Sequence, residues 1–228
     1  MKVNKLKLVI ISDTHTLHHQ LKVPEGNALV HCGDWTNRGE LHSIASFLDW
    51  FALQPHKHKV FIAGNHELGL EGYGRKEALK LIHYYTNTID NFHYLENSSV
   101  VIEGLNFYGS PATPFFCNWA FNFQRGKDIA VEWKKIPDNV NVLITHGPSY
   151  GILDMVEDNP SNRGRDLHQG CKDLAERISF LRELELHCYG HLHTDGGKYQ
   201  KVLGVTYVNA AVCNEQYKPD NLPIVIEL

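Results

Sequence analysis

Short apolar runs alternate with helix-like patterns along most of the chain. Leu6–Ser12 is a nearly continuous apolar run, which is typical of a strand that is buried on both faces of a sheet. Similar runs predict four more strands, at Ala28–Cys32, Val60–Ala63, Val140–Thr145 and Leu186–Tyr189. Apolar residues recur at helical spacing at 41–51, 78–89 and 174–184. This alternation predicts α/β units.

The middle and the end of the chain are richer in strands. Further short strands are expected at Tyr94–Leu95, Val100–Ile102, Phe107–Tyr108, Val205–Asn209 and Ile224–Leu228. The 228 residues contain no repeat, low-complexity tract or flexible linker. We therefore expect an α/β protein with a single domain over 1–228.

The composition narrows the function classes. Hydrophobic residues make up 43% of the chain, charged residues 21%, and the net charge is −4. These values argue against an extended basic surface for nucleic acid or for an anionic membrane. No segment approaches the roughly 20 apolar residues that span a bilayer. Five scattered cysteines without a CxxC pair argue against a disulfide framework and favour a cytoplasmic protein.

Polar residues with potential metal-binding side chains follow five of the predicted strands. The first three strands run into Ser12-Asp13-Thr14-His15, Gly33-Asp34 and Gly64-Asn65-His66-Glu67. Two later strands run into His146-Gly147 and Gly190-His191-Leu192-His193. Ligands in open α/β sheets sit beyond the carboxyl ends of the strands. We therefore expect these five segments to meet at one sheet edge.

The donor groups in these segments are carboxylate, imidazole and amide, without thiolate, which suits Mn, Fe or Zn. Because side chains alternate along an extended segment, Asp-x-His and His-x-His would each present two donors on one face. A carboxylate such as Asp34 can bridge two cations, and two cations clamp both the attacking and the leaving oxygen of a phosphoryl group. Gly33, Gly64 and Gly190 beside the ligands permit tight turns and close backbone approach.

In this order, the motifs Asp-x-His, Gly-Asp, Gly-Asn-His-Glu, Thr-His-Gly and Gly-His-x-His resemble those of the calcineurin-like metallophosphoesterase superfamily, over Leu8–Asn209. Each motif is weak alone, whereas the ordered set is specific. The chain most resembles one branch, the brain-type metallophosphoesterase-domain proteins and their class III phosphodiesterase relatives. Segments at 111–126, 145–154, 168–171 and 223–226 share this resemblance.

The resemblance implies a four-layer sandwich, with two central mixed β-sheets flanked by helices and a dinuclear metal site at the sheet edge. It assigns to metal one Asp13, His15, Asp34 and His193. It assigns to metal two Asp34, Asn65, His146 and His191, so that Asp34 bridges the ions. The two divalent ions implied are Mn²⁺ by preference, with Fe or Zn as alternatives. Two such ions, two carboxylates and one hydroxide leave about one positive charge, which attracts phosphate.

His66 would not bind metal in this scheme. The resemblance implies that it protonates the leaving oxygen while metal-bound hydroxide attacks phosphorus in line. Residues 33–39 also resemble the Gly-Asp-x-Val-Asp-Arg-Gly motif of Ser/Thr protein phosphatases, in which the aspartate before the arginine pairs with the catalytic histidine. Here Asn37 stands at that position and cannot act as an anionic partner.

Three further residues are candidates for substrate binding. Arg38 would bind a phosphate oxygen in bidentate fashion, or it is a surface arginine. His168 would line the site, and Asn209 either supports the site from a strand end or is a simple turn residue. The aromatic segment at 115–123 forms either a wall for an aryl group or packing on the core. Arg163 and Arg165 either close over a phosphate or are solvated.

We expect a metal-dependent hydrolase of small phosphate esters or nucleotides, favoured as a phosphodiesterase. The alternative enzyme is a phosphomonoesterase, including the Ser/Thr protein phosphatase type. The alternative from another class is a nucleotide-binding regulatory protein with weak activity. Neither a membrane nor an extended nucleic acid is an expected partner. The oligomeric state stays open, a homodimer included.

Overall fold

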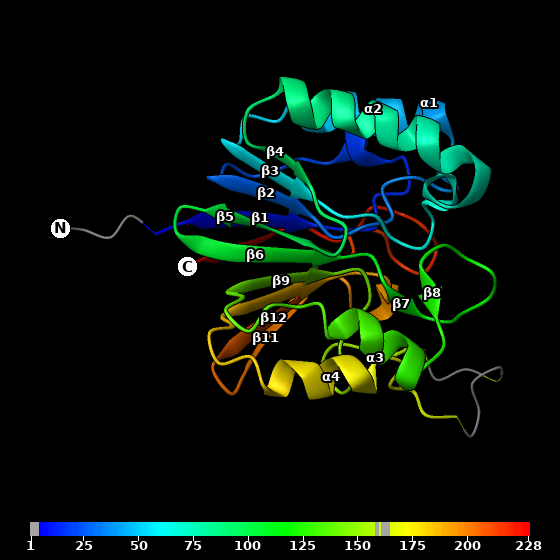
Figure 1. The fold of residues 1–228 in the computed structure, drawn as a ribbon, viewed down its shortest axis with the longest axis vertical. Helices are drawn as coiled ribbons and strands as arrows, with labels where there is room; N and C mark the ends of the chain where they lie inside the picture. The colour runs from blue at the N-terminus through cyan, green and yellow to red at the C-terminus, as the bar shows by residue number, and fades with distance from the viewer. Residues whose placement is uncertain (1–4, 158–159, 161–164) are drawn as a thin grey trace.

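In the computed structural model, which describes residues 5–157, 160 and 165–228, two β-sheets pack face to face. The first sheet has the order β13-β1-β2-β3-β4. Its parallel strands are β1 (Lys7–Ile11), β2 (Ala28–His31), β3 (His58–Phe61) and β4 (Phe92–Tyr94). Strand β13 (Ile224–Glu227) pairs antiparallel with β1. Helices α1 (Leu41–Ala52) and α2 (Arg75–Thr88) cover the outer face (Figure 1).

The second sheet has the order β11-β12-β10-β9-β6-β5. Its four middle strands are parallel: β6 (Leu105–Ser110), β9 (Val142–Thr145), β10 (Leu186–Tyr189) and β12 (Val205–Asn209). Two antiparallel strands form its edges, β5 (Ser98–Ile102) and β11 (Lys198–Val202). Helices α3 (Lys127–Trp133) and α4 (Lys172–Ser179) cover its outer face (Figure 1).

Shorter elements complete the fold beyond the strand ends. Strands β7 (Thr113–Pro114) and β8 (Asn122–Phe123) form a small parallel pair. Within the described ranges, 3₁₀ turns lie in the connections at η1 (His18–Gln20), η2 (Leu68–Leu70), η3 (Gly72–Gly74) and η4 (His193–Asp195).

Strand β1 shows why its apolar run is continuous. Leu8 and Ile10 belong to the core between the two sheets, while Val9 and Ile11 belong to the core beneath α1 and α2. All four side chains are fully buried. The strand therefore has no solvent-facing side, and alternation of apolar and polar residues is absent for that reason.

The predicted four-layer α/β sandwich is confirmed, and the differences concern short elements. Helix α3 has seven residues and strand β11 is mostly exposed, so neither carries an apolar pattern strong enough to predict it. The helix predicted at 174–184 is wrong at its end, because α4 stops at Ser179. Leu181 and Leu184 continue the apolar spacing but fill the core from the turn that follows.

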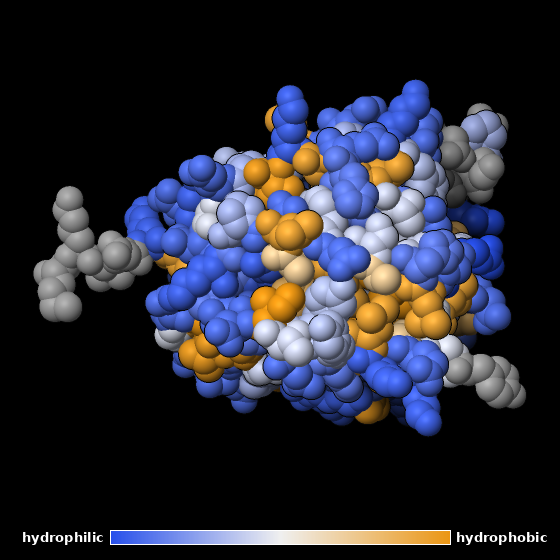
Figure 2. All heavy atoms as spheres, turned by 90° about the horizontal axis from the view of Figure 1, so that it is seen from above, coloured by the Kyte–Doolittle hydropathy of each residue, from blue (hydrophilic) through white to orange (hydrophobic). Residues whose placement is uncertain are grey.

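The outer surface of the first helical layer is mixed in character. Figure 2 looks down on the side of α1 and α2 and shows hydrophobic atoms in separate patches among hydrophilic ones. Among the described residues, no helix combines the length and the hydropathy that crossing a membrane requires.

The carboxyl ends of the parallel strands of both sheets lie on the same side of the sandwich (Figure 1). Ser12, just beyond β1, forms an isolated parallel bridge with Ala211, just beyond β12. The Val212 N–H also donates a hydrogen bond to the Ser12 carbonyl (3.0 Å). These bonds join the two sheets at the end where the polar strand-end segments emerge.

We predict that His187 makes the fold less stable as the pH falls. Its imidazole is fully buried in β10 and bonds to the Thr145 hydroxyl (2.8 Å), and burial lowers its pKa to about 3. The unfolded chain, in which a histidine pKa is about 6.5, therefore binds the proton first. The contribution of neutral His187 is complete above about pH 6.5 and is lost as the pH falls toward 3, at about 1.4 kcal/mol per pH unit.

The change His187→Gln keeps a hydrogen-bonding side chain but removes this titration. Urea unfolding of the chelator-treated protein at pH 7 and pH 5 should show a smaller loss of unfolding free energy for the variant than for the wild type. Equal losses in the two proteins would contradict the prediction.

Candidate metal centre

The loops after five strands bring the seven predicted metal ligands to one end of the sandwich. The first sheet supplies four of them, after β1, β2 and β3: Asp13, His15, Asp34 and Asn65. The second sheet supplies three, after β9 and β10: His146, His191 and His193. The candidate site therefore lies at the seam between the two sheets.

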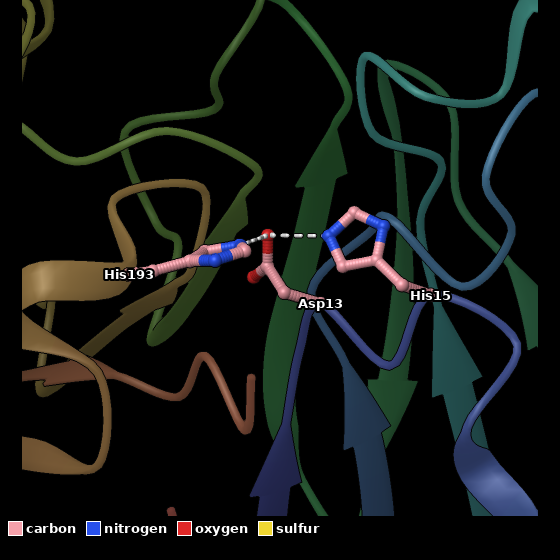
Figure 3. A group of neighbouring side chains, drawn as sticks. All are labelled: Asp13, His15 and His193. Atoms are coloured by element: carbon pink, nitrogen blue, oxygen red, sulfur yellow. Dashed lines mark hydrogen bonds and ion pairs between the residues drawn. The ribbon is translucent and has the colours of Figure 1, made fainter. Parts of the chain in front are cut away.

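Asp13 is the centre of one group of donors (Figure 3). Its Oδ1 lies 3.3 Å from Nε2 of His193 and 4.0 Å from Nε2 of His15. One donor atom from each of the three residues lies within 4.8 Å of the other two. Asp13 also accepts the His191 backbone N–H, at 3.1 and 2.9 Å to its two oxygens. Asp13, after β1, thus holds the loop after β10 in place by hydrogen bonds.

Asp34 is the centre of a second group. Its Oδ2 lies 3.2 Å from Nε2 of His146 and 4.0 Å from Nε2 of His15. Asp34, His146 and His191 each offer a donor atom within 4.8 Å of the others. Asn65 adds an amide oxygen 2.9 Å from His146 Nε2. Asp34 Oδ2 thus lies within 4.0 Å of one histidine from each group, His15 and His146, and its role as the bridging ligand stays a prediction.

His15 indicates that these groups fit metal ions. His15 is 3% exposed, yet neither ring nitrogen has a hydrogen-bond partner among the described residues. Leaving a buried polar group unpaired is costly. Metal–ligand bonds of roughly 2.0–2.2 Å place two ligands of one ion up to about 4 Å apart. The distances from His15 Nε2 to the two carboxylates fall at that limit, so the donor set fits divalent metal ions.

Four of the predicted ligands adopt left-handed backbone conformations. The φ angles are 53° for Asp13, 41° for His15, 55° for Asp34 and 67° for His191. Each costs on the order of 1–3 kcal/mol and persists only where the surroundings enforce it. The expectation of extended Asp-x-His and His-x-His segments is therefore wrong, because β1 and β10 end before the ligands. Tight turns gather the side chains instead.

Three glycines beside the ligands have no room for a side chain. A Cβ on Gly190 would lie 1.9 Å from Asp13 Oδ2, and one on Gly64 would lie 2.2 Å from Asp34 Oδ1. A Cβ on Gly33 would lie 2.5 Å from His146 Nδ1. Any other residue would displace one of these side chains. The glycines therefore allow the close backbone approach that the sequence predicted.

The buried Glu67 carboxylate sets the Asp34 loop relative to the Asn65 loop. Its Oε2 accepts the N–H groups of Asp34 (3.0 Å) and Gly64 (2.7 Å). Its Oε1 accepts the N–H and the hydroxyl of Thr36, both at 2.9 Å. Burial, and then the charge of Asp34, raise the pKa of Glu67 to about 8, while the donors act in the opposite direction.

Three imidazoles are oriented in the same way, by a bond from Nδ1 to a backbone carbonyl. The partners are Cys32 for His146 (2.9 Å), Asn214 for His193 (2.9 Å) and Asn37 for His66 (2.8 Å). Because Nδ1–H donates in each case, Nε2 is turned toward the carboxylates. The Asn37 backbone carbonyl thus supplies the partner for His66 that the Asn37 side chain cannot.

Without metal, each of the two carboxylates and two of the imidazoles stabilises the charged form of its partner. Burial opposes the ionised forms of Asp13 and Asp34, but their histidine partners hold both pKa values well below the usual range. Burial also opposes protonation of His146 and His193, yet Asp34 and Asp13 raise each pKa to about 9. Burial lowers the pKa of His191 to about 4. At neutral pH, the positive charges of protonated His146 and His193 therefore balance the negative charges of the two carboxylates.

A cavity of about 550 Å³ opens onto this cluster. Its lining includes Asp34, Asn65, His66, His191 and His193. His66 Nε2 lies 3.9 Å from Asp34 Oδ2, within the range of the metal-binding groups. Distance therefore does not separate His66 from the ligands, and its exclusion from the metal set stays a prediction.

The three candidate substrate-binding residues lie outside the cavity lining, and their contacts are with protein. The Arg38 guanidinium lies 5.7 Å from the centre of the Trp119 ring. His168 Nδ1 bonds to Asp154 (2.6 Å). The Asn209 amide donates to the carbonyls of Leu153 (3.3 Å) and Leu192 (2.9 Å), which holds the loop between His191 and His193. Their roles toward substrate stay predictions.

The aromatic segment at 115–123 was expected to form either a wall of the site or packing on the core, and its residues do both. Phe116 and Trp119 line the cavity, whereas Phe121 packs in the core beneath α1 and α2. Arg165 also lines the cavity. Arg163 lies outside the described residues.

Tyr217 is a cavity residue that no sequence motif marks. Its ring lies 4.8 Å from the His15 ring and 5.3 Å from the His193 ring, measured between centroids. Its φ of 55° is unusual for a bulky residue. Glu157, Gln169 and Glu215 also line the cavity. None of these residues follows a strand directly, so the strand-end rule does not find them.

We predict that Asp34→Ala weakens the binding of both metal ions, because Asp34 lies between the two donor groups. Elemental analysis of purified protein should show a loss of both ions in Asp34→Ala. The matched variant His193→Ala, which changes the Asp13 group alone, should lose only one. A normal metal content in Asp34→Ala would contradict the shared position.

We also predict that metal binding releases protons from His146 and His193. Both pKa values are about 9 without metal, so each imidazole must lose a proton before it can bind an ion. Apparent metal affinity should therefore rise from pH 6 to about pH 9. Titration calorimetry at pH 7 in buffers of different ionisation enthalpy should show release of about two protons. A heat that does not depend on the buffer would contradict this.

Comparison with known proteins identifies the family. The calcineurin-like phosphoesterase family model matches residues 6–195. Human metallophosphoesterase domain-containing protein 1 is 35% identical over 237 residues, which cover 97% of this chain and 71% of that protein. UPF0046 protein K07C11.7 of Caenorhabditis elegans is 36% identical over 226 residues, with 96% and 74% covered. The chain therefore belongs to the calcineurin-like phosphoesterase family and is a metal-dependent hydrolase of phosphoric esters.

Proposed function

We propose that the protein is a dinuclear metal-dependent phosphodiesterase that hydrolyses small phosphate esters, with His66 as the general acid. The position of His66 carries the proposal. It lines the cavity, its Nδ1 is fixed by the Asn37 carbonyl, and its Nε2 faces the Asp34 carboxylate. An ester bound at the metal-binding end would therefore have a proton donor beside it.

When bound, divalent ions at the seven ligands would supply a water of lowered pKa and positive charge for the phosphate. The residues of the chain place the other participants. The carbonyl anchors keep Nε2 of His146 and of His193 turned toward the carboxylates. His66 is held in the same way, so that a proton on its Nε2 is directed at the leaving oxygen.

The charges around the cavity favour a diester over a monoester. Among the described lining residues, Arg165 alone carries a permanent positive charge, and the exposed Glu215 is acidic. A phosphate monoester carries about two negative charges at neutral pH and a diester only one, so Glu215 opposes the monoester more strongly. Phe116 and Tyr217 offer aromatic surface for the organic groups of a diester.

The remaining features of the proposal follow from the donor set and the cysteines. Imidazole and carboxylate without thiolate suit Mn²⁺, Fe or Zn, and the family resemblance favours Mn²⁺ among them. The five free cysteines support the cytoplasm as the compartment. The proposed partner is a small phosphate ester or a nucleotide, bound by one domain over 1–228.

We predict that His66→Ala keeps both metal ions but slows turnover of esters with poor leaving groups by roughly 10²–10⁴. Alkoxides need a proton to leave, whereas p-nitrophenolate does not, so hydrolysis of p-nitrophenyl esters should change much less. Steady-state rates and metal content together check this. The control His83→Ala, at an exposed histidine of α2, should behave as the wild type. Loss of metal from His66→Ala would instead make His66 a ligand.

We predict faster hydrolysis of bis-p-nitrophenyl phosphate than of p-nitrophenyl phosphate, in each case with Mn²⁺ and not with chelator. The single negative charge of the diester is opposed less by Glu215, and its organic groups fit the aromatic surface of the cavity. Faster monoester hydrolysis would favour the phosphomonoesterase. Hydrolysis of neither ester, with two ions bound, would favour the nucleotide-binding regulatory protein.

A further inference from the structure

Trp119 covers one face of the His66 imidazole. The two ring centroids are 4.2 Å apart and the ring planes are inclined by 25°, which is a stacked arrangement. The His15 ring meets His66 edge to face, with centroids 4.7 Å apart and planes at 77°. Together with the bond from Nδ1 to the Asn37 carbonyl, these contacts restrain the ring and leave Nε2 toward the carboxylates.

The loop that carries Trp119 is fastened to the turn that carries His66. The Ala120 N–H donates to the Asn65 carbonyl (3.0 Å), so residues adjacent to Trp119 and to His66 are directly bonded. The Phe121 N–H donates to the Glu71 carboxylate (2.7 Å), and the Phe121 side chain packs in the core. Trp119 therefore has a fixed position relative to His66, unlike a residue at the tip of a free loop.

Arg38 adds a second contact to the indole. Its guanidinium carbon lies 5.7 Å from the Trp119 ring centroid, within the range at which a cation is attracted to an aromatic face. Because Arg38 follows Asn37, the segment that anchors His66 through Nδ1 also contacts the residue that stacks on it. One short segment, 37–38, thus fixes both the imidazole and its aromatic neighbour.

We propose that Trp119 is a positioning residue that holds the plane of His66, so that Nε2 points at the leaving oxygen. This inference rests on the proposed role of His66 as the general acid. The hydrogen bond at Nδ1 alone would let the imidazole tilt about that bond, and the indole face, with the edge contact of His15, prevents this tilt. Proton transfer requires hydrogen-bond reach, and a misplacement of about 1 Å can cost on the order of 10²-fold in rate.

The test measures kcat and KM of Trp119→Leu on diesters with an alkoxide leaving group and with p-nitrophenolate. We expect kcat to fall by about ten- to a hundredfold for the alkyl diester and by less than about twofold for the aryl diester, with metal content unchanged. Trp119→Phe, which keeps a flat aromatic face, should recover most of the alkyl-diester rate. Trp119→Met, which fills similar space without that face, is the second variant and should behave as Trp119→Leu.

Phe116→Leu is the matched control, because Phe116 is an exposed aromatic residue of the same cavity lining. It should shift KM and leave the ratio of alkyl to aryl rates as in the wild type. If Trp119→Leu and Trp119→Met lower both rates equally, Trp119 contacts substrate rather than positioning His66, and the inference is wrong.

A double variant separates this inference from the proposed function. His66→Ala/Trp119→Leu should be no slower on the alkyl diester than His66→Ala alone, because there is no imidazole left to position. Losses that multiply in the double variant would overturn the inference while leaving His66 as the acid. Equal losses on both diesters in His66→Ala alone would overturn the general-acid role itself.

Discussion

Asp13 and Asp34 are enclosed where the two sheets meet, and an enclosed carboxylate is tolerated only beside hydrogen-bond donors and positive charge. Backbone N–H groups of other loops supply the donors, His191 to Asp13 across the seam and His66 to Asp34 within the first sheet. Protonated His146 and His193 supply the charge while no metal is bound. Divalent ions would replace those protons. The glycines and left-handed turns bring these groups into contact, and their strain is tolerated for that reason.

The sandwich makes the cluster possible because each sheet holds half of it. The carboxylates follow β1 and β2 of the first sheet, and three of the imidazoles follow β9 and β10 of the second. Leu8 and Ile10 of β1 share a core with Val142 and Ile144 of β9, so packing between the sheets also sets the distance between ligands. Metal binding and sheet packing are therefore coupled, since loosening the core would separate the two halves of the site.

The sequence predicted which side chains gather at the end of the sandwich but not their local conformation. Parallel strands deliver their final residues to a common edge, so the order of motifs was enough to place Asp13, Asp34 and His146 together. The turns depend on contacts between distant loops, such as Glu67 with Thr36, and no local pattern encodes them. Trp119 and Tyr217 reach the cavity through irregular loops, where neither alternation nor helical spacing applies. The sequence therefore left the 115–123 segment with two alternative roles and did not mark Tyr217 at all.

The central claim is that the strand-end donors hold two metal ions close together with Asp34 shared between them. Electron paramagnetic resonance of metal-free protein titrated with Mn²⁺ tests it most directly. Ions about 3.5–4 Å apart in a two-metal site interact magnetically. We expect the signal at two equivalents to be that of a spin-coupled pair, with a weak or absent six-line signal of isolated ions. A six-line signal that grows in proportion to both equivalents would contradict the shared site.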